Sequence, residues 1–352
     1  MRRKLTTIYA TLCMLLMAAG FVLVFAIASK QGTWQMIESL YGLAIGFIIA
    51  PIFHELGHVA FARMANMEEV YVKCFCFAFT KEQGKWKISL KSPMAPDETQ
   101  VIPKSGGDMQ RRAKQYAIGG LVFGGCLFVV LLVGALLCTA LGATKYALWG
   151  MLPYPAYLFF LNLPPVEYPL GKTDALVYQG LKKGEDAEKV MIAIMEIQGQ
   201  LYEGKSYTEI EESLYFNLPQ LRMDEPLYMA LLDLRYRYFL GKEEYERAGD
   251  CLQRMLAARG YLSEWEEEKV LAECTYLHIL RGNLTEAEAC SKGCRNYLQA
   301  EDVGAKRILL ALAKKFGQEH AVEPLRLQAE EALEKEWIAG VKKAEAKLLA
   351  KI

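Results

Sequence analysis

The apolar run Tyr41–Phe53, YGLAIGFIIAPIF, leads directly into the pentapeptide HELGH at residues 54–58. The run is typical of a membrane helix, and a helix that continues through it places His54 and His58 one above the other on one face. Two imidazoles at this spacing can bind one Zn²⁺, and the carboxylate of Glu55 can take a proton from the water on the metal. The sequence therefore predicts a zinc site within a membrane helix.

This pentapeptide stands out against the composition of the chain. The chain has only four histidines, and two of them fall here. Ionisable groups at membrane depth are costly, so their default interpretation is functional. The alternative is a polar pair that packs between helices or reaches the interface at the end of a helix.

The composition changes sharply along the 352 residues. Residues 1–178 carry the long apolar runs and predict a membrane domain, whereas residues 179–352 mix charges of both signs and predict a soluble domain. The formal net charge is zero, which argues against nucleic acid as a partner and leaves the lipid bilayer and other proteins.

The apolar runs predict an α-helical integral membrane protein with about four transmembrane helices, each long enough for a hydrocarbon core of ~30 Å. The first run follows three basic residues and is interpreted as an uncleaved anchor. Lys and Arg concentrate at the N-terminus and in the loop 65–115, so both termini are expected in the cytoplasm of a multi-pass protein, in the cell membrane. The expected spans are Ile8–Ala28, Tyr41–Met64, Tyr116–Leu141 and Tyr146–Tyr168.

A catalytic zinc ion normally takes three protein ligands and leaves a fourth position for water. The third ligand is expected at the cytoplasmic end of the fourth run, where Pro164 and Pro165 break the helix and Glu167 and Asp174 follow. Broken helices at membrane depth are tolerated where they line a cavity. Asp174 follows a turn that can restart a helix, where it could also act as the N-cap, and Glu167 is a rival ligand.

The HELGH pentapeptide in a membrane helix, followed by Asn162-Leu-Pro-Pro and by Asp174, resembles the site-2 protease family of intramembrane zinc metalloproteases. The resemblance covers residues 41–178. It implies that His54, His58 and Asp174 hold zinc and that Glu55 activates water. The glycine-rich stretch 119–125, GGLVFGG, resembles the small-residue motif on the family's intervening helix. The chain departs from the family in a longer Asn162–Asp174 spacing and in Ala175, where glycine is usual.

The loop between the second and third spans carries a strand pattern. Residues 70–79 and 85–91 alternate imperfectly on either side of Gly84 and predict a small β-hairpin in a cytoplasmic loop. The exposed edge of this hairpin could add an unwound substrate as a further strand, or the hairpin could simply plug the mouth of the site.

The C-terminal half predicts an all-α soluble domain. Turn signals with Gly204, Gly241, Gly282 and Gly317 recur at intervals of 37, 41 and 35 residues between amphipathic stretches. The pattern resembles a divergent tetratricopeptide-type array, and an irregular helical bundle is the alternative. Either fold offers a surface for a cytoplasmic protein partner.

These features predict an intramembrane zinc metalloendopeptidase that hydrolyses transmembrane or hydrophobic peptides. The alternative is a catalytically inactive membrane scaffold that presents the helical domain to partners. Such a scaffold needs neither the two histidines nor Glu55.

Overall fold

The computed structural model describes residues 2–82, 85–93, 95–104, 107–141, 145–168 and 171–352. The chain divides into two compact units. The first ends at Glu185, and the second contains Asp186–Ile352 together with the short segment that begins at Pro103. This boundary lies a few residues after the position 178 that the composition indicates.

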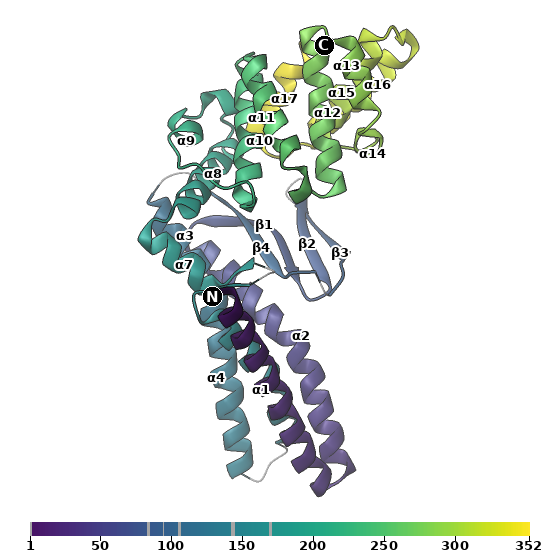
Figure 1. Cartoon of the computed structure of the whole chain (residues 1–352). Coiled ribbons are helices and arrows are strands. Elements are labelled where there is room, and N and C mark those ends of the chain that lie inside the picture. The colour runs from purple at the N-terminus through teal and green to yellow at the C-terminus, as the bar shows by residue number, and fades with distance from the viewer. Residues whose placement is uncertain (1, 83–84, 94, 105–106, 142–144, 169–170) are drawn as a thin grey trace. The chain divides into compact units, whose positions relative to one another are not determined.

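The first unit is built on long apolar helices that run side by side (Figure 1). They are α1 (Arg2–Gln31), α2 (Thr33–Met64), and α3 (Met109–Ala117) followed by α4 (Gly119–Ala140). Among the described residues, three segments are long and apolar enough to cross a membrane: Leu5–Gln31, Thr33–Met64 and Met109–Ala140. Many of their large apolar side chains are exposed, as membrane contact requires.

The fourth span, predicted over Tyr146–Tyr168, ends earlier, at Asn162. The chain forms α5 (Tyr146–Met151) and α6 (Pro153–Asn162), and Leu152 between them keeps α-helical φ and ψ of −64° and −38°. Pro153 and Pro155 lack the backbone N–H that an uninterrupted helix needs at these positions. Together α5 and α6 extend over about 25 Å at 1.5 Å per residue. They end before the Pro164–Pro165 pair, as the sequence predicts.

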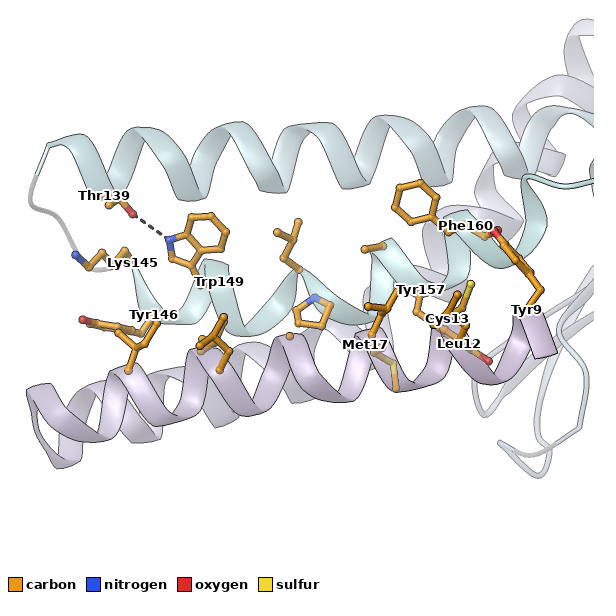
Figure 2. A pocket seen from close by; sticks show the side chains of 18 residues that line it. Tyr9, Leu12, Cys13, Met17, Thr139, Lys145, Tyr146, Trp149, Tyr157 and Phe160 are labelled. Carbon is orange, nitrogen blue, oxygen red and sulfur yellow. Dashed lines mark hydrogen bonds between the residues drawn. The ribbon is translucent and has the colours of Figure 1, made fainter. Parts of the chain in front are cut away.

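A groove of about 740 Å³ lies between α1 and the α5–α6 segment (Figure 2). Its lining is almost entirely apolar, and hydrogen bonds mark its two ends. At one end Trp149 Nε1 donates to Thr139 Oγ1 at 2.9 Å, and at the other the hydroxyl of Tyr9 donates to the carbonyl of Phe160 at 2.7 Å. The second bond ties the start of α1 to the end of α6.

The loop after α2 forms a sheet that is larger than the predicted hairpin. Its described strands are β1 (Met67–Cys74), β2 (Phe77–Glu82), β3 (Lys85–Leu90) and β4 (Glu98–Pro103), in the order β3-β2-β1-β4. The predicted first strand, 70–79, instead turns at Phe75, whose φ is +55°, so that Cys74 pairs with Phe77. Gly84, the predicted turn, lies outside the described residues. Every residue of β3 is exposed.

The segment after α6 forms the short strands β5 (Glu167–Tyr168) and β6 (Gly171–Lys172), followed by α7 (Asp174–Lys183). Helix α7 ends at Gly184, which adopts the left-handed conformation that glycine accepts without steric cost. This segment returns the chain to the helices of the first unit, because α7 packs against α3 and α4.

The second unit is helical over its described elements (Figure 1). Antiparallel pairs follow one another in sequence, and Gly282 and Gly317 take left-handed conformations at turns between paired helices. Large apolar and aromatic side chains, such as Tyr215, Tyr236 and Tyr276, fill the core. The elements are α8 (Asp186–Tyr202), η1 (Tyr207–Glu209), α9 (Ser213–Phe216), α10 (Pro226–Gly241), α11 (Tyr245–Ala257), η2 (Arg259–Tyr261), α12 (Glu264–Arg281), α13 (Leu284–Ser291), α14 (Arg295–Leu298), α15 (Val303–Lys315), α16 (Glu319–Lys335) and α17 (Ala339–Leu349).

Candidate metal centre

The two histidines of the pentapeptide lie on one face of α2, as their spacing predicts. Helix α2 is continuous through Pro51 and through both histidines. The rings of His54 and His58 have centroids 5.1 Å apart and stand nearly perpendicular to each other. His58 is buried and His54 is partly buried. Both imidazoles therefore point into the interior of the first unit.

Asp174 reaches the histidines because Thr173 takes the role of the helix cap. The hydroxyl oxygen of Thr173 accepts the Leu176 N–H at 3.2 Å, and the same hydroxyl donates to the Pro164 carbonyl at 2.8 Å. The alternative that Asp174 itself caps the helix is therefore wrong. Its carboxylate, at the first position of α7, is left to face α2.

The carboxylate of Asp174 lies symmetrically between the two imidazoles. Its Oδ2 is 3.4 Å from His54 Nε2 and 3.4 Å from His58 Nε2. One ligand atom from each residue lies within 4.8 Å of the other two. Among the described residues, the buried Oδ2 has no hydrogen-bond partner. A buried acceptor of this kind needs an explanation, and a bound cation is one.

Glu167, the rival ligand, lies elsewhere. Its side chain is exposed on β5, opposite Lys172 in the register of β5 and β6. It does not belong to the histidine–aspartate cluster. Of the two acids that the sequence left open, the structure places Asp174 beside the histidines.

The charge of Asp174 suits a cation site. Burial alone would raise its pKa, but the facing imidazoles of His58 and His54 hold the pKa below its usual value. The backbone of Leu121, in the first turn of α4, acts in the same direction. The carboxyl group is therefore ionised at neutral pH, which is the form that binds metals.

A hydrogen bond orients the ring of His58. Its Nδ1 lies 3.1 Å from the carbonyl oxygen of Tyr116. A carbonyl oxygen can only accept, so Nδ1 carries a proton, and Nε2 is the nitrogen that faces Asp174. Metal-binding histidines usually have their second nitrogen fixed in this way.

Glu55 lies one residue after His54 and is only 4% exposed. Its Oε2 accepts a hydrogen bond of 2.6 Å from the hydroxyl of Thr99, on β4. The Tyr116 hydroxyl in turn donates to the Thr99 carbonyl. The sequence analysis missed both Thr99 and Tyr116 as site residues, because neither belongs to a motif or lies near the pentapeptide in sequence.

Glycines on α4 allow the helices to meet at this site. The backbones of Gly57 and Gly119 approach so closely that a Cβ on either would collide with the other. A Cβ on Gly120 would lie 2.5 Å from His58 Nε2 and 2.6 Å from His54 Nε2. The glycine-rich motif that the resemblance indicates therefore has a steric reason: it leaves the space between the imidazole nitrogens open.

Two imidazole nitrogens and the carboxylate of Asp174 form a set of atoms that could bind a metal ion, and the carboxylate of Glu55 lies on the neighbouring residue. The other histidines lie in the second unit, His278 on α12 and His320 exposed on α16. Neither His278 nor His320 belongs to a cluster of described residues that could hold a metal ion. Comparison of the chain with protein-family models, with curated proteins and with solved structures finds no match.

Proposed function

We propose that this protein is an integral-membrane zinc endopeptidase that cleaves membrane-embedded or hydrophobic peptides. The observation that carries the proposal is the convergence of His54, His58 and Asp174 beside Glu55 in an apolar helix. Three such ligands with an adjacent carboxylate base are the usual set of a hydrolytic zinc site.

The distances support zinc as the metal. Two ligand atoms that are each about 2.0–2.1 Å from a tetrahedral ion are about 3.4 Å apart. Asp174 Oδ2 lies 3.4 Å from each imidazole Nε2. The Oδ2 atom without a hydrogen-bond partner among the described residues, and the His58 ring oriented by its Nδ1 contact, are the other features that fit a bound cation.

The residues would divide the chemistry as follows. His54, His58 and Asp174 would hold the ion, which when bound would lower the pKa of a water to about 7 and polarise the scissile carbonyl. Glu55 would take the proton from the attacking water and pass it to the leaving amine. Its burial keeps the carboxylate in a water-poor environment close to the histidines.

A membrane-embedded substrate fits the place of the site. The ligands lie at the end of an apolar helix, so the scissile bond must also lie near the membrane. A substrate helix satisfies its own backbone hydrogen bonds, so it must unwind locally before attack. The exposed β3 edge of the sheet is a surface to which an unwound segment could add as a strand.

The same proposal includes a topology. The Tyr9–Phe160 hydrogen bond brings the beginning of α1 and the end of α6 together. This contact supports a chain that returns to its starting side after α6, and the lysines and arginines of residues 2–4 and 65–115 support a cytoplasmic location for that side. Both termini are then cytoplasmic, and the helical second unit can bind a cytoplasmic protein.

The decisive test uses the purified full chain in lipid vesicles. The probe is a single transmembrane-helix peptide with a fluorophore and a quencher at its two ends. We expect about one zinc per chain, cleavage that a chelator stops, and recovery when zinc is restored. Glu55→Gln should retain its zinc and lose about 10²–10⁴-fold in turnover.

Two outcomes would contradict this proposal. Cleavage at the normal rate by Glu55→Gln would exclude Glu55 as the base. A folded wild-type protein that binds no metal and cleaves no hydrophobic peptide would favour the inactive membrane scaffold.

A further inference from the structure

Among the described residues, one side chain, that of Thr99, holds the carboxylate of Glu55. The Thr99 hydroxyl donates to Oε2 at 2.6 Å. Both side chains are buried, Glu55 to 4% exposure and Thr99 to 8%. A hydroxyl has a single proton to donate, so Thr99 engages one oxygen of the carboxylate, Oε2, and leaves Oε1 as the oxygen that can take a proton.

Thr99 is itself held in place by Tyr116. The hydroxyl of Tyr116 donates to the backbone carbonyl of Thr99, and the backbone carbonyl of Tyr116 accepts from His58 Nδ1. Glu55 and His58 are three residues apart on α2 and so are neighbours on its surface. The hydrogen bonds therefore close a ring that joins the base, β4, α3 and a histidine of the candidate metal site.

The position of Thr99 makes its hydroxyl a stiff donor. A β-branched side chain in a strand has few accessible χ1 rotamers, so little entropy opposes one fixed direction. The hydroxyl that contacts Glu55 comes from a residue 44 positions away in sequence. The direction of the carboxylate is thus set by the sheet and not only by α2.

We propose that Thr99 is a positioning residue that aims the carboxylate of Glu55, and that Tyr116 links this support to His58. The inference rests on the proposed function, because it assigns Thr99 a role in the reaction of that site. When Oε1 of Glu55 takes a proton from water, the Thr99 hydrogen bond to Oε2 remains in place, and the carboxyl group does not rotate away from the leaving amine.

The first test compares two substitutions that remove different parts of Thr99. Thr99→Val keeps the shape and removes the hydroxyl, whereas Thr99→Ser keeps the hydroxyl and removes a methyl group. With the transmembrane-helix peptide as the probe, we expect Thr99→Val to lower kcat by about 10–100-fold, with KM and bound zinc unchanged. Thr99→Ser should retain most of the wild-type kcat.

A packing role predicts the opposite order, with Thr99→Ser more damaging than Thr99→Val. That order, or a wild-type kcat in Thr99→Val, would overturn the inference. The matched control is Thr275→Val, because Thr275 is also buried and donates to a backbone carbonyl, that of Leu271, but lies in the second unit. This control should leave kcat and KM unchanged.

The second test measures the contact without using activity. Thermal unfolding of the metal-free full chain is compared for wild type, Thr99→Val, Glu55→Ala and the double variant. When Glu55 is present, we expect Thr99→Val to lower the midpoint temperature of unfolding strongly. In the Glu55→Ala background the same substitution should lower it only slightly, because the buried acceptor is then gone. Additive shifts would show that the two side chains do not interact and would overturn the inference.

The two tests separate the inference from the proposed function. A wild-type protein without zinc or cleavage would remove the proposed function, whatever the thermal cycle shows. An active wild-type protein with additive thermal shifts and a normal Thr99→Val would remove only the role of Thr99.

Discussion

Each unit buries a cluster of ionisable side chains, and the two clusters differ in how completely they are paired. In the second unit, Arg307 is fully buried and donates to both oxygens of Glu273 and to Glu345 at 2.8–3.0 Å. Tyr236 also donates to Glu273, and the Arg307 guanidinium lies 4.0 Å from the ring centre of Tyr276. Only Nη1 of this guanidinium has no hydrogen-bond partner among the described residues.

In the cluster of the first unit, formed by His54, His58 and Asp174, the polar atoms face one another without forming good hydrogen bonds. Asp174 Oδ2 faces two imidazole nitrogens at 3.4 Å, which is too long for a good hydrogen bond and suitable for ligands around an ion. In the second unit opposite charges satisfy each other directly, so the cluster stabilises one packing arrangement. This difference supports our proposal that the first cluster holds a metal ion, whereas the second stabilises the fold.

The largest effect is expected when the carboxylate of Asp174 is removed from the first cluster. Asp174→Ala removes one of the three proposed ligands, so zinc affinity should fall by more than the ~10–100-fold that loss of an outer partner causes. Metal content after dialysis is the measurement.

Glu167→Ala is the matched control, because this acid is exposed on β5 and lies outside the cluster. It should retain its zinc. The reverse pattern, with zinc lost from the Glu167 variant, would transfer the ligand role to Glu167.

A smaller perturbation crowds the cluster without removing a ligand. Gly120→Ala introduces a Cβ 2.5 Å from His58 Nε2, so the rings must shift, and zinc affinity should fall by at least about 10-fold. Competition with a chromogenic chelator measures the change. Gly124→Ala is the control on the same helix, because its Cβ would meet His54 Nδ1 at an ordinary 3.9 Å. Equal affinities in the two variants would argue against a metal between the imidazoles.

The third prediction breaks the paired cluster. Arg307→Met removes the guanidinium that donates to both Glu273 and Glu345 and leaves Arg237, 3.7 Å from Glu345, as their nearest cation. The second unit should therefore lose about 3 kcal/mol of its free energy of unfolding, the lower end of the range for a broken buried pair. Hydrogen exchange of α12 and α15 reports this loss for the second unit alone.

Lys292→Met removes an exposed ion pair with Glu288 and should cost about 0.5 kcal/mol or less. Zinc content should stay unchanged in both variants. Equal exchange rates in the two would mean that the buried pairs contribute no more than a surface pair.

The smallest expected effect concerns pH. Burial alone would raise the pKa of Glu273, but Arg307 and Arg237 hold it below its ordinary value of 4.5. A carboxylate with a lowered folded-state pKa stabilises the fold above its unfolded-state pKa, and this contribution is lost as the pH falls through the folded-state value. Exchange in α12 should therefore accelerate as the pH falls below about 4.5, after correction for the intrinsic rate. In Glu273→Gln the exchange rate of α12 should rise less steeply as the pH falls. If it rises as steeply as in the wild type, carboxylates other than Glu273 cause the acid dependence.

The sequence predicted an element of either unit correctly where the pattern that specifies it lies within one helix or one turn. The HELGH helix, the apolar spans around it and the turn glycines at 282 and 317 all follow from periodicity or backbone freedom. The errors also have local causes. The fourth span ends at Asn162, just before Pro164 and Pro165, and the first predicted strand turns at Phe75, a non-glycine residue with positive φ.

The sequence by itself determined which residues could form a metal site, because two histidines and a glutamate at fixed helical spacing need only one helix to bring them together. Only the tertiary structure decided between Asp174 and Glu167, since that choice depends on where α7 packs and on Thr173 taking the cap. The same holds for Thr99 and Tyr116, whose contacts with Glu55 and His58 join residues 44 and 58 positions apart. Contacts across such distances are set by the packing of helices and sheet, and no short sequence pattern encodes them.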